Sequence, residues 1–264
     1  TKSRQRIFSC RPTAPVEETL CAQQILRDIG SLAYRRQLSD NDLVNLMAFY
    51  RSGATERGFE GGIQMAIEAI LASPHFVFRI EQIPAGDSAR STYHVRDIDL
   101  ASRLSFFLWA SVPDRDLIDL AITGELSRPG VLEAQVRRML ADSRSEALAT
   151  RFASQWLRLQ DLDKIHPDVR EYPDFDEQLR AAMRRETEMF FENLLREDRS
   201  VLELIDADYT FVNERLAKHY GIADIAGTEF RRVGLEGERR GLLGHGSILT
   251  STSHAARTSP VLRG

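Results

Sequence analysis

The stretch that most constrains this fold is residues 176–196, where apolar side chains recur at helical spacing. Glu186 lies in the middle of this stripe, between Met183 and Phe190, when residues are placed at about 100° each around a helix. A buried carboxylate needs a partner or must take up a proton. The sequence therefore predicts a core helix with an acid facing inward. The apolar stripe comprises Leu179, Ala182, Met183, Phe190 and Leu194.

Arg103 is the predicted partner of that acid. Residues 97–109 are apolar nearly all round, which predicts a central helix buried on several sides, and Arg103 is the one charge beyond its first turns. A buried guanidinium is as improbable as a buried carboxylate unless the two meet. We therefore predict a buried Arg103–Glu186 ion pair. The alternative is that Arg103 reaches solvent while Glu186 sits at the edge of a groove.

Helical periodicity elsewhere predicts an all-α fold, an irregular multi-helix bundle with little or no strand. An N-terminal helical module would pack on a larger helical domain. The only strand expected is short, at residues 230–233, and single helices are expected over residues 145–159 and 211–220. The polar residues 84–92 predict a domain boundary after residues 1–83, a three-helix module. Ser259 and Pro260 would start a helix that the chain does not complete, so we expect a fragment.

Composition excludes some classes of protein. The 264 residues carry a formal net charge of −4, and Lys and Arg are interspersed with Asp and Glu. This pattern argues against a nucleic-acid partner, which would require clustered basic residues. No apolar run approaches the about 18 residues that a transmembrane helix needs.

The chain has two cysteines, Cys10 and Cys21. The residues alone leave two interpretations open: two free thiols in a core, or a disulfide closing a small ring where a proline-containing loop enters a helix. A disulfide would imply an oxidising compartment.

The C-terminal stretch offers candidate ligands without a recognised motif. His245 and His254 lie near Arg257 and Arg263, a combination that could hold an anion or offer an imidazole to a metal or haem iron. Their spacing matches no known metal site, so the metal is unknown. The nearby serines lack the nucleophile elbow of hydrolases. Glu186 could act as a general acid if a cleft exposed it. No catalytic residue is identified.

Three strings resemble a known family: residues 100–109 (LASRLSFFLW), residues 206–217 (DADYTFVNERLA), and residues 241–250 (GLLGHGSILT) leading to residues 257–264 (RTSPVLRG). They are similar to uncharacterised helical domains of large exported proteins of planctomycetes and other bacteria, often alongside a c-type cytochrome domain. The resemblance implies export to the periplasm or cell surface, and thus favours the Cys10–Cys21 disulfide. It also implies that residues 84–222 are a central helical domain and that residues 223–264 are the start of an incomplete third domain. It implies no catalytic residues.

These expectations combine into a non-catalytic helical scaffold or partner-binding module of an exported, cytochrome-associated protein. We expect a protein partner or larger assembly, with a c-type cytochrome as the candidate, and no cofactor held by this chain itself. Haem contact through a partner domain stays open, since the chain lacks a haem-attachment motif. The first alternative is a redox component with haem or metal against the C-terminal segment, and a hydrolase ranks last.

Overall fold

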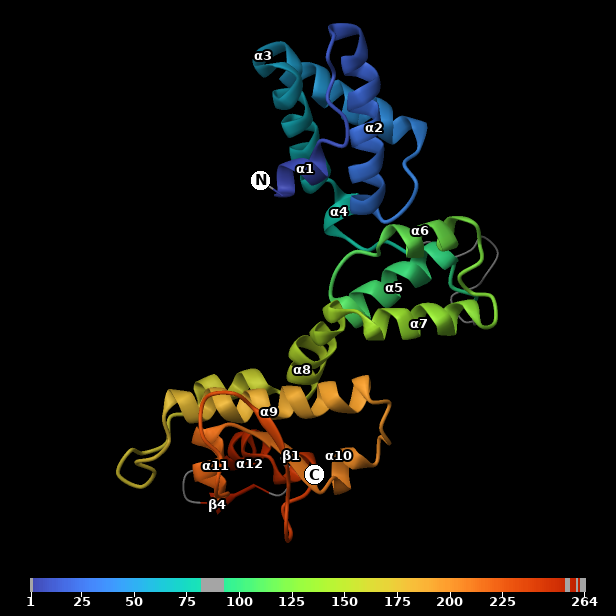
Figure 1. The fold of residues 1–264 in the computed structure, drawn as a ribbon. Helices are drawn as coiled ribbons and strands as arrows, with labels where there is room; N and C mark the ends of the chain where they lie inside the picture. The colour runs from blue at the N-terminus through green and yellow to red at the C-terminus, as the bar shows by residue number, and fades with distance from the viewer. Residues whose placement is uncertain (1, 82–92, 255–256, 260, 262–264) are drawn as a thin grey trace. The chain divides into compact units, whose positions relative to one another are not determined.

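Helices dominate the computed structural model, which describes residues 2–81, 93–254, 257–259 and 261 (Figure 1). Strands form only two small antiparallel pairs in these ranges. The predicted mostly helical fold is confirmed. No helix in the described ranges is long and apolar enough to cross a membrane.

The chain divides into two compact units. Unit 1 contains Thr1–Phe107 and Ser111–Arg137, and unit 2 contains Leu108–Ala110 and Arg138–Gly264. The predicted domain boundaries at residues 83 and 222 stay a prediction. The helices of unit 1 are α1 (Lys2–Ile7), α2 (Pro15–Tyr34), α3 (Asp40–Ala72), α4 (Pro74–Val77), α5 (Asp97–Trp109), α6 (Arg115–Ile122) and α7 (Val131–Ala141), of which α5 and α7 continue into unit 2.

Helix boundaries in unit 1 follow local sequence signals. Pro15 occupies the first turn of α2, and Ser39 with Asp42 forms a capping box at the start of α3. Non-helical backbone at Arg57 and Gly58 divides α3 into two helical halves. These halves pack with α2 around a shared core. This core includes Ile25, Leu26, Leu46, Met47, Ile63 and Ile70.

Unit 2 is built around α9 (Glu177–Arg196), the helix predicted to organise the core. The side-chain carboxylate of Asp176 caps α9 by accepting from the Leu179 amide at 2.6 Å. The whole predicted apolar stripe is buried, together with Glu186. The helix contacts β1 (Tyr209–Val212), α11 (Glu214–Tyr220) and α12 (Gly246–Ser251) (Figure 1). The remaining elements are η1 (Ser143–Ser145), η2 (Leu148–Ala153), α8 (Ser154–Trp156), η3 (Leu159–Lys164), α10 (Glu203–Asp206), β2 (Arg231–Gly234), η4 (Leu242–Gly244), β3 (Ser253–His254) and β4 (Arg257–Thr258).

Two predicted helices of unit 2 are only partly right. Residues 146–156 are continuously helical, but residues 148–153 are π-helical. The helix ends before Arg158, which has a left-handed backbone, and a 3₁₀ segment follows. Residues 209–212 are strand β1, because this β-branched and aromatic sequence pairs antiparallel with β2. Helix α11 therefore begins later than predicted, capped by Asn213. The expected short strand at residues 230–233 is confirmed as β2.

Candidate functional site

Glu186 lies at the centre of a buried polar cluster in unit 2. Its side chain is 1% exposed, as the sequence pattern predicted. One carboxylate oxygen, Oε1, accepts a hydrogen bond from the Thr210 hydroxyl at 2.6 Å. The other, Oε2, accepts from the Tyr220 hydroxyl at 2.6 Å. Because the three residues belong to α9, β1 and α11, this acid joins three elements of the unit.

Tyr220 extends the cluster to a fourth element. Its hydroxyl oxygen accepts a hydrogen bond from the backbone N–H of Gly246, the first residue of α12, at 2.7 Å. A Cβ atom at position 246 would lie 2.9 Å from that hydroxyl and 2.9 Å from the Cε atom of Met183, so a larger residue would have to displace these side chains. The guanidinium of Arg239 lies 4.0 Å from the centre of the Tyr220 ring, a cation–π contact. Two hydrogen bonds of the Tyr220 hydroxyl therefore connect Glu186 on α9 to the start of α12.

Burial is the largest influence on the charge of Glu186. It raises the pKa of this carboxyl group to about 7, although hydrogen bonds from Thr210 and Tyr220 and the charge of Arg239 oppose the rise. Burial likewise raises the pKa of the Tyr220 hydroxyl, and the carboxylate beside it adds to the effect. Glu186 therefore exchanges its proton near neutral pH, whereas Tyr220 remains a hydrogen-bond donor.

The predicted buried ion pair between Arg103 and Glu186 is wrong. The Arg103 side chain is 49% exposed, and its Nε donates to the Glu81 carboxylate at 2.7 Å. Two hydroxyl groups supply the donors to Glu186, and a raised pKa removes the need for a counter-charge. The alternative was right that Arg103 reaches solvent. It was wrong to place Glu186 at the edge of a groove, because the carboxylate is enclosed.

His245 lies in the same interior and is 1% exposed. Its Nδ1 is 2.9 Å from the hydroxyl of Thr187, which in turn is 2.6 Å from the hydroxyl of Ser247. The ring meets Phe190 edge-on, with 4.9 Å between the ring centres. Its Nε2 has no hydrogen-bond partner in the described part of the chain. Burial and the charge of Arg239 lower the pKa of His245 to about 3, so the imidazole is neutral.

The other residues of the predicted ligand loop are only partly described. The backbones of His254 and Arg257 pair with each other between β3 and β4, while their side chains, and all of Arg263, lie outside the described residues. A shared anion or metal site with His245 stays a prediction. Among the residues that the structure describes, no three His, Cys, Asp or Glu side chains gather as metal ligands would.

Sequence reasoning missed the partners that complete this cluster. Thr187, Thr210 and Tyr220 lie on three separate elements. Thr187 follows Glu186 directly in the sequence, and Tyr220 lies at the end of the predicted helix over residues 211–220. Small hydroxyl groups carry no spacing signal that distinguishes a buried donor from a solvated one. Only the approach of β1, α11 and α12 to α9 identifies them.

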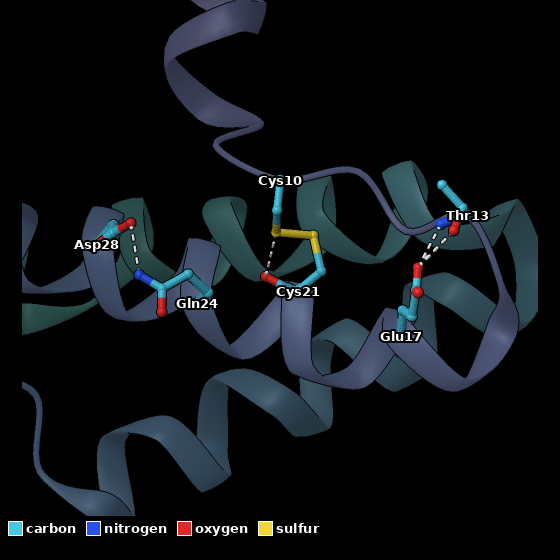
Figure 2. The surroundings of a disulfide bond; sticks show 6 residues. All are labelled: Cys10, Thr13, Glu17, Cys21, Gln24 and Asp28. Atoms are coloured by element: carbon cyan, nitrogen blue, oxygen red, sulfur yellow. Dashed lines mark hydrogen bonds between the residues drawn. A yellow bond between two sulfur atoms is a disulfide. The ribbon is translucent and has the colours of Figure 1, made fainter.

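Cys10 and Cys21 form a disulfide, as the family resemblance implied (Figure 2). Their Cα atoms are 5.8 Å apart, and the bond joins the segment before α2 to the buried face of that helix. Thr13, in the loop between the cysteines, donates through its amide and hydroxyl groups to Glu17 (Figure 2). The disulfide and this helix-start contact together hold the N-terminal segment against α2.

Two family models match parts of the chain. Residues 95–222 match the family model PSD4, protein of unknown function (DUF1592), and residues 21–81 match PSD5, protein of unknown function (DUF1595). No curated protein and no solved structure matches the chain. Glu186, Thr210 and Tyr220 lie inside the first matched region, whereas His245 and Gly246 lie beyond its end.

Proposed function

We propose that this chain, with its two domains of unknown function, is a non-catalytic helical scaffold or partner-binding module of an exported protein that works beside a c-type cytochrome. The observation that carries the proposal is an apolar patch on unit 2. Val201, Leu202 and Ile205, at and before α10, are 71%, 64% and 66% exposed, and Leu243 in η4 is half-exposed. Contiguous exposed apolar side chains of this kind mark interaction sites.

The backbone next to the apolar patch is closely packed. The N–H of Gly241 donates to the carbonyl of Ala207 at 3.0 Å, and a Cβ at Gly241 would lie 2.5 Å from the carbonyl oxygens of Leu204 and Ile205. Because Gly241 also has a positive φ of 47°, this approach requires glycine. Leu242, next in the chain, is buried beneath. The outward apolar residues are therefore held in place and need no rearrangement to meet a partner.

Two further observations support the setting of this proposal. The Cys10–Cys21 disulfide is the kind of bond that persists in an oxidising compartment, which supports export to the periplasm or cell surface. The resemblance to domains of exported, cytochrome-associated proteins supports a c-type cytochrome as the partner and electron transfer as the process.

The test is co-purification of the chain from its source with a haem protein. We expect a partner with a haem absorption band to elute with the wild-type chain, and the Leu202→Asp and Ile205→Asp variants to lose it. Val169→Asp, at a position 70% exposed in a loop of unit 2, is the matched control and should retain the partner. Equal retention by all variants, or turnover of a substrate by the isolated chain, would refute the proposal.

A second candidate is a redox component in which haem or metal lies against the C-terminal segment. It is favoured by the buried Nε2 of His245, which lacks a partner within the described ranges. Coordination through Nε2 would require α12 to move, because the ring is enclosed. A Soret band, or bound metal by elemental analysis, that disappears in His245→Gln would support this function over the first. A hydrolase using Glu186 ranks third, and unchanged activity of Glu186→Gln would remove that acid from it.

A further inference from the structure

Unit 1 contains a cavity of about 590 Å³ lined by five arginines. The cavity lies among the end of α2, the residues that follow α4, and the helices α5 and α6. Its volume falls within the range of about 300–1,000 Å³ that is typical of small-molecule sites. The arginines are Arg35, Arg36, Arg79, Arg96 and Arg103.

Three of the five positive charges have carboxylate partners. Each of these guanidinium groups is within hydrogen-bonding distance of an acid in the same unit. The pairs are Arg36 with Asp42 at 2.6 Å, Arg96 with Asp99 at 2.8 Å, and Arg103 with Glu81 at 2.7 Å. Two positive charges, on Arg35 and Arg79, are therefore left over.

Arg35 is the buried member of this unmatched pair. Its side chain donates only to backbone carbonyl oxygens, including those of His75 at 2.7 Å and Phe78 at 2.8 Å, and the residue is 7% exposed. These dipoles satisfy the donors without neutralising the charge. Burial lowers the pKa of Arg35, and the nearby charge of Arg79 lowers it further. Buried charges in proteins are normally paired with an opposite charge.

Arg79 is the accessible member. Its guanidinium lies 4.8 Å from the centre of the Phe106 ring, and that of Arg35 lies 5.8 Å from the same ring centre. No ion pair of Arg79 is present among the described residues. Its charge helps to lower the pKa of Glu81, but the carboxylate of Glu81 forms its hydrogen bond with Arg103. Arg35 and Arg79 both line the cavity, and their two like charges lie beside the same aromatic ring. An anion bound in the cavity would reduce the repulsion between them.

We propose that this cavity binds a small organic anion whose oxyanion group, a carboxylate, sulfate or phosphate, neutralises the paired charges of Arg35 and Arg79. Arg79 is the direct donor, because the terminal nitrogens of Arg35 are occupied by carbonyl groups. Tyr34, Phe78 and Ile98 line the same cavity and supply apolar surface for the organic body of the ligand. This site is separate from the apolar patch of unit 2.

The test is isothermal titration calorimetry of the full chain with sodium phosphate, sodium sulfate and sodium citrate at constant ionic strength set by chloride. We expect saturable binding of at least one anion. Arg79→Gln should weaken its Kd at least tenfold, and Arg79→Lys, which keeps the charge, should restore part of the affinity. The order of the three anions distinguishes a carboxylate from a tetrahedral oxyanion.

Arg137→Gln is the matched control, because Arg137 is an exposed arginine of unit 1 that does not line the cavity. It should bind as the wild type does. Far-UV circular dichroism should show that every variant is folded. The absence of saturable heat from all three anions, or equal Kd values for Arg79→Gln and the wild type, would overturn the proposal.

Discussion

Replacing Glu186 with glutamine should change how the stability of unit 2 depends on pH. Glutamine keeps the size of the side chain and an acceptor oxygen but carries no titrating proton. In the wild type the carboxyl group is enclosed between Thr210 and Tyr220, and burial raises its pKa from 4.5 to about 7. The folded state therefore holds this proton more tightly than the unfolded chain does.

The sign and size of the effect follow from proton linkage. Between about pH 4.5 and about pH 7 the unfolded state has released the proton and the folded state keeps it, so the free energy of unfolding falls as pH rises. A difference of about 2.5 pKa units at about 1.4 kcal/mol each amounts to about 3.5 kcal/mol. This stabilisation is fully present below about pH 4.5 and is lost as pH rises through about 7. His245, with its lowered pKa, contributes the opposite slope at acidic pH.

Urea unfolding at pH 5, 6, 7 and 8, followed by tryptophan fluorescence, measures this effect. Trp109 and Trp156 are the two tryptophans of the chain, and both belong to unit 2, so the signal reports the unit that holds Glu186. The wild-type free energy of unfolding minus that of Glu186→Gln should fall by about 2.5 kcal/mol between pH 5 and pH 8, because part of the full effect is already lost at pH 5. Subtracting the two curves removes contributions from His245 and other groups that both proteins share.

Glu177→Gln is the control, because Glu177 lies on the same helix with a side chain that is 76% exposed. Its pH profile should parallel that of the wild type. Parallel profiles for wild type and Glu186→Gln would refute the reasoning, since they would show that the buried carboxyl group titrates as it does in the unfolded chain.

Two other changes test the packing. Replacing Cys10 and Cys21 by serine should lower the free energy of unfolding of unit 1 by about 3 kcal/mol, because the unfolded chain gains conformational freedom. Urea unfolding followed by far-UV circular dichroism measures this loss. An unchanged unfolding midpoint would contradict the prediction. Gly246→Ala should destabilise unit 2 by about 1–3 kcal/mol in the fluorescence assay, because its Cβ would lie 2.9 Å from the Tyr220 hydroxyl. Gly234→Ala, where a Cβ meets nothing within 4 Å, should cost less, and equal losses would exclude the steric explanation.

Local patterns in the sequence determined most of the helices. Periodicity placed the buried face of α9 and the inward direction of Glu186, because the angle between residues in a helix depends only on the helix. Pro15 and the Ser39–Asp42 capping box marked the starts of α2 and α3, because both signals act on the backbone of their own first turn. The Cys10–Cys21 pair came from the family resemblance, since spacing alone left free thiols open.

Only the tertiary structure decided which groups meet. β1 is a strand because β2, some twenty residues further on, pairs with it, and that pairing brings Thr210 to Glu186. The sequence suggested Arg103 as the partner because a buried carboxylate was expected to need a positively charged group beside it. In the folded unit two hydroxyl groups and a retained proton serve instead, and this choice depends on which elements cross α9, which no local pattern encodes.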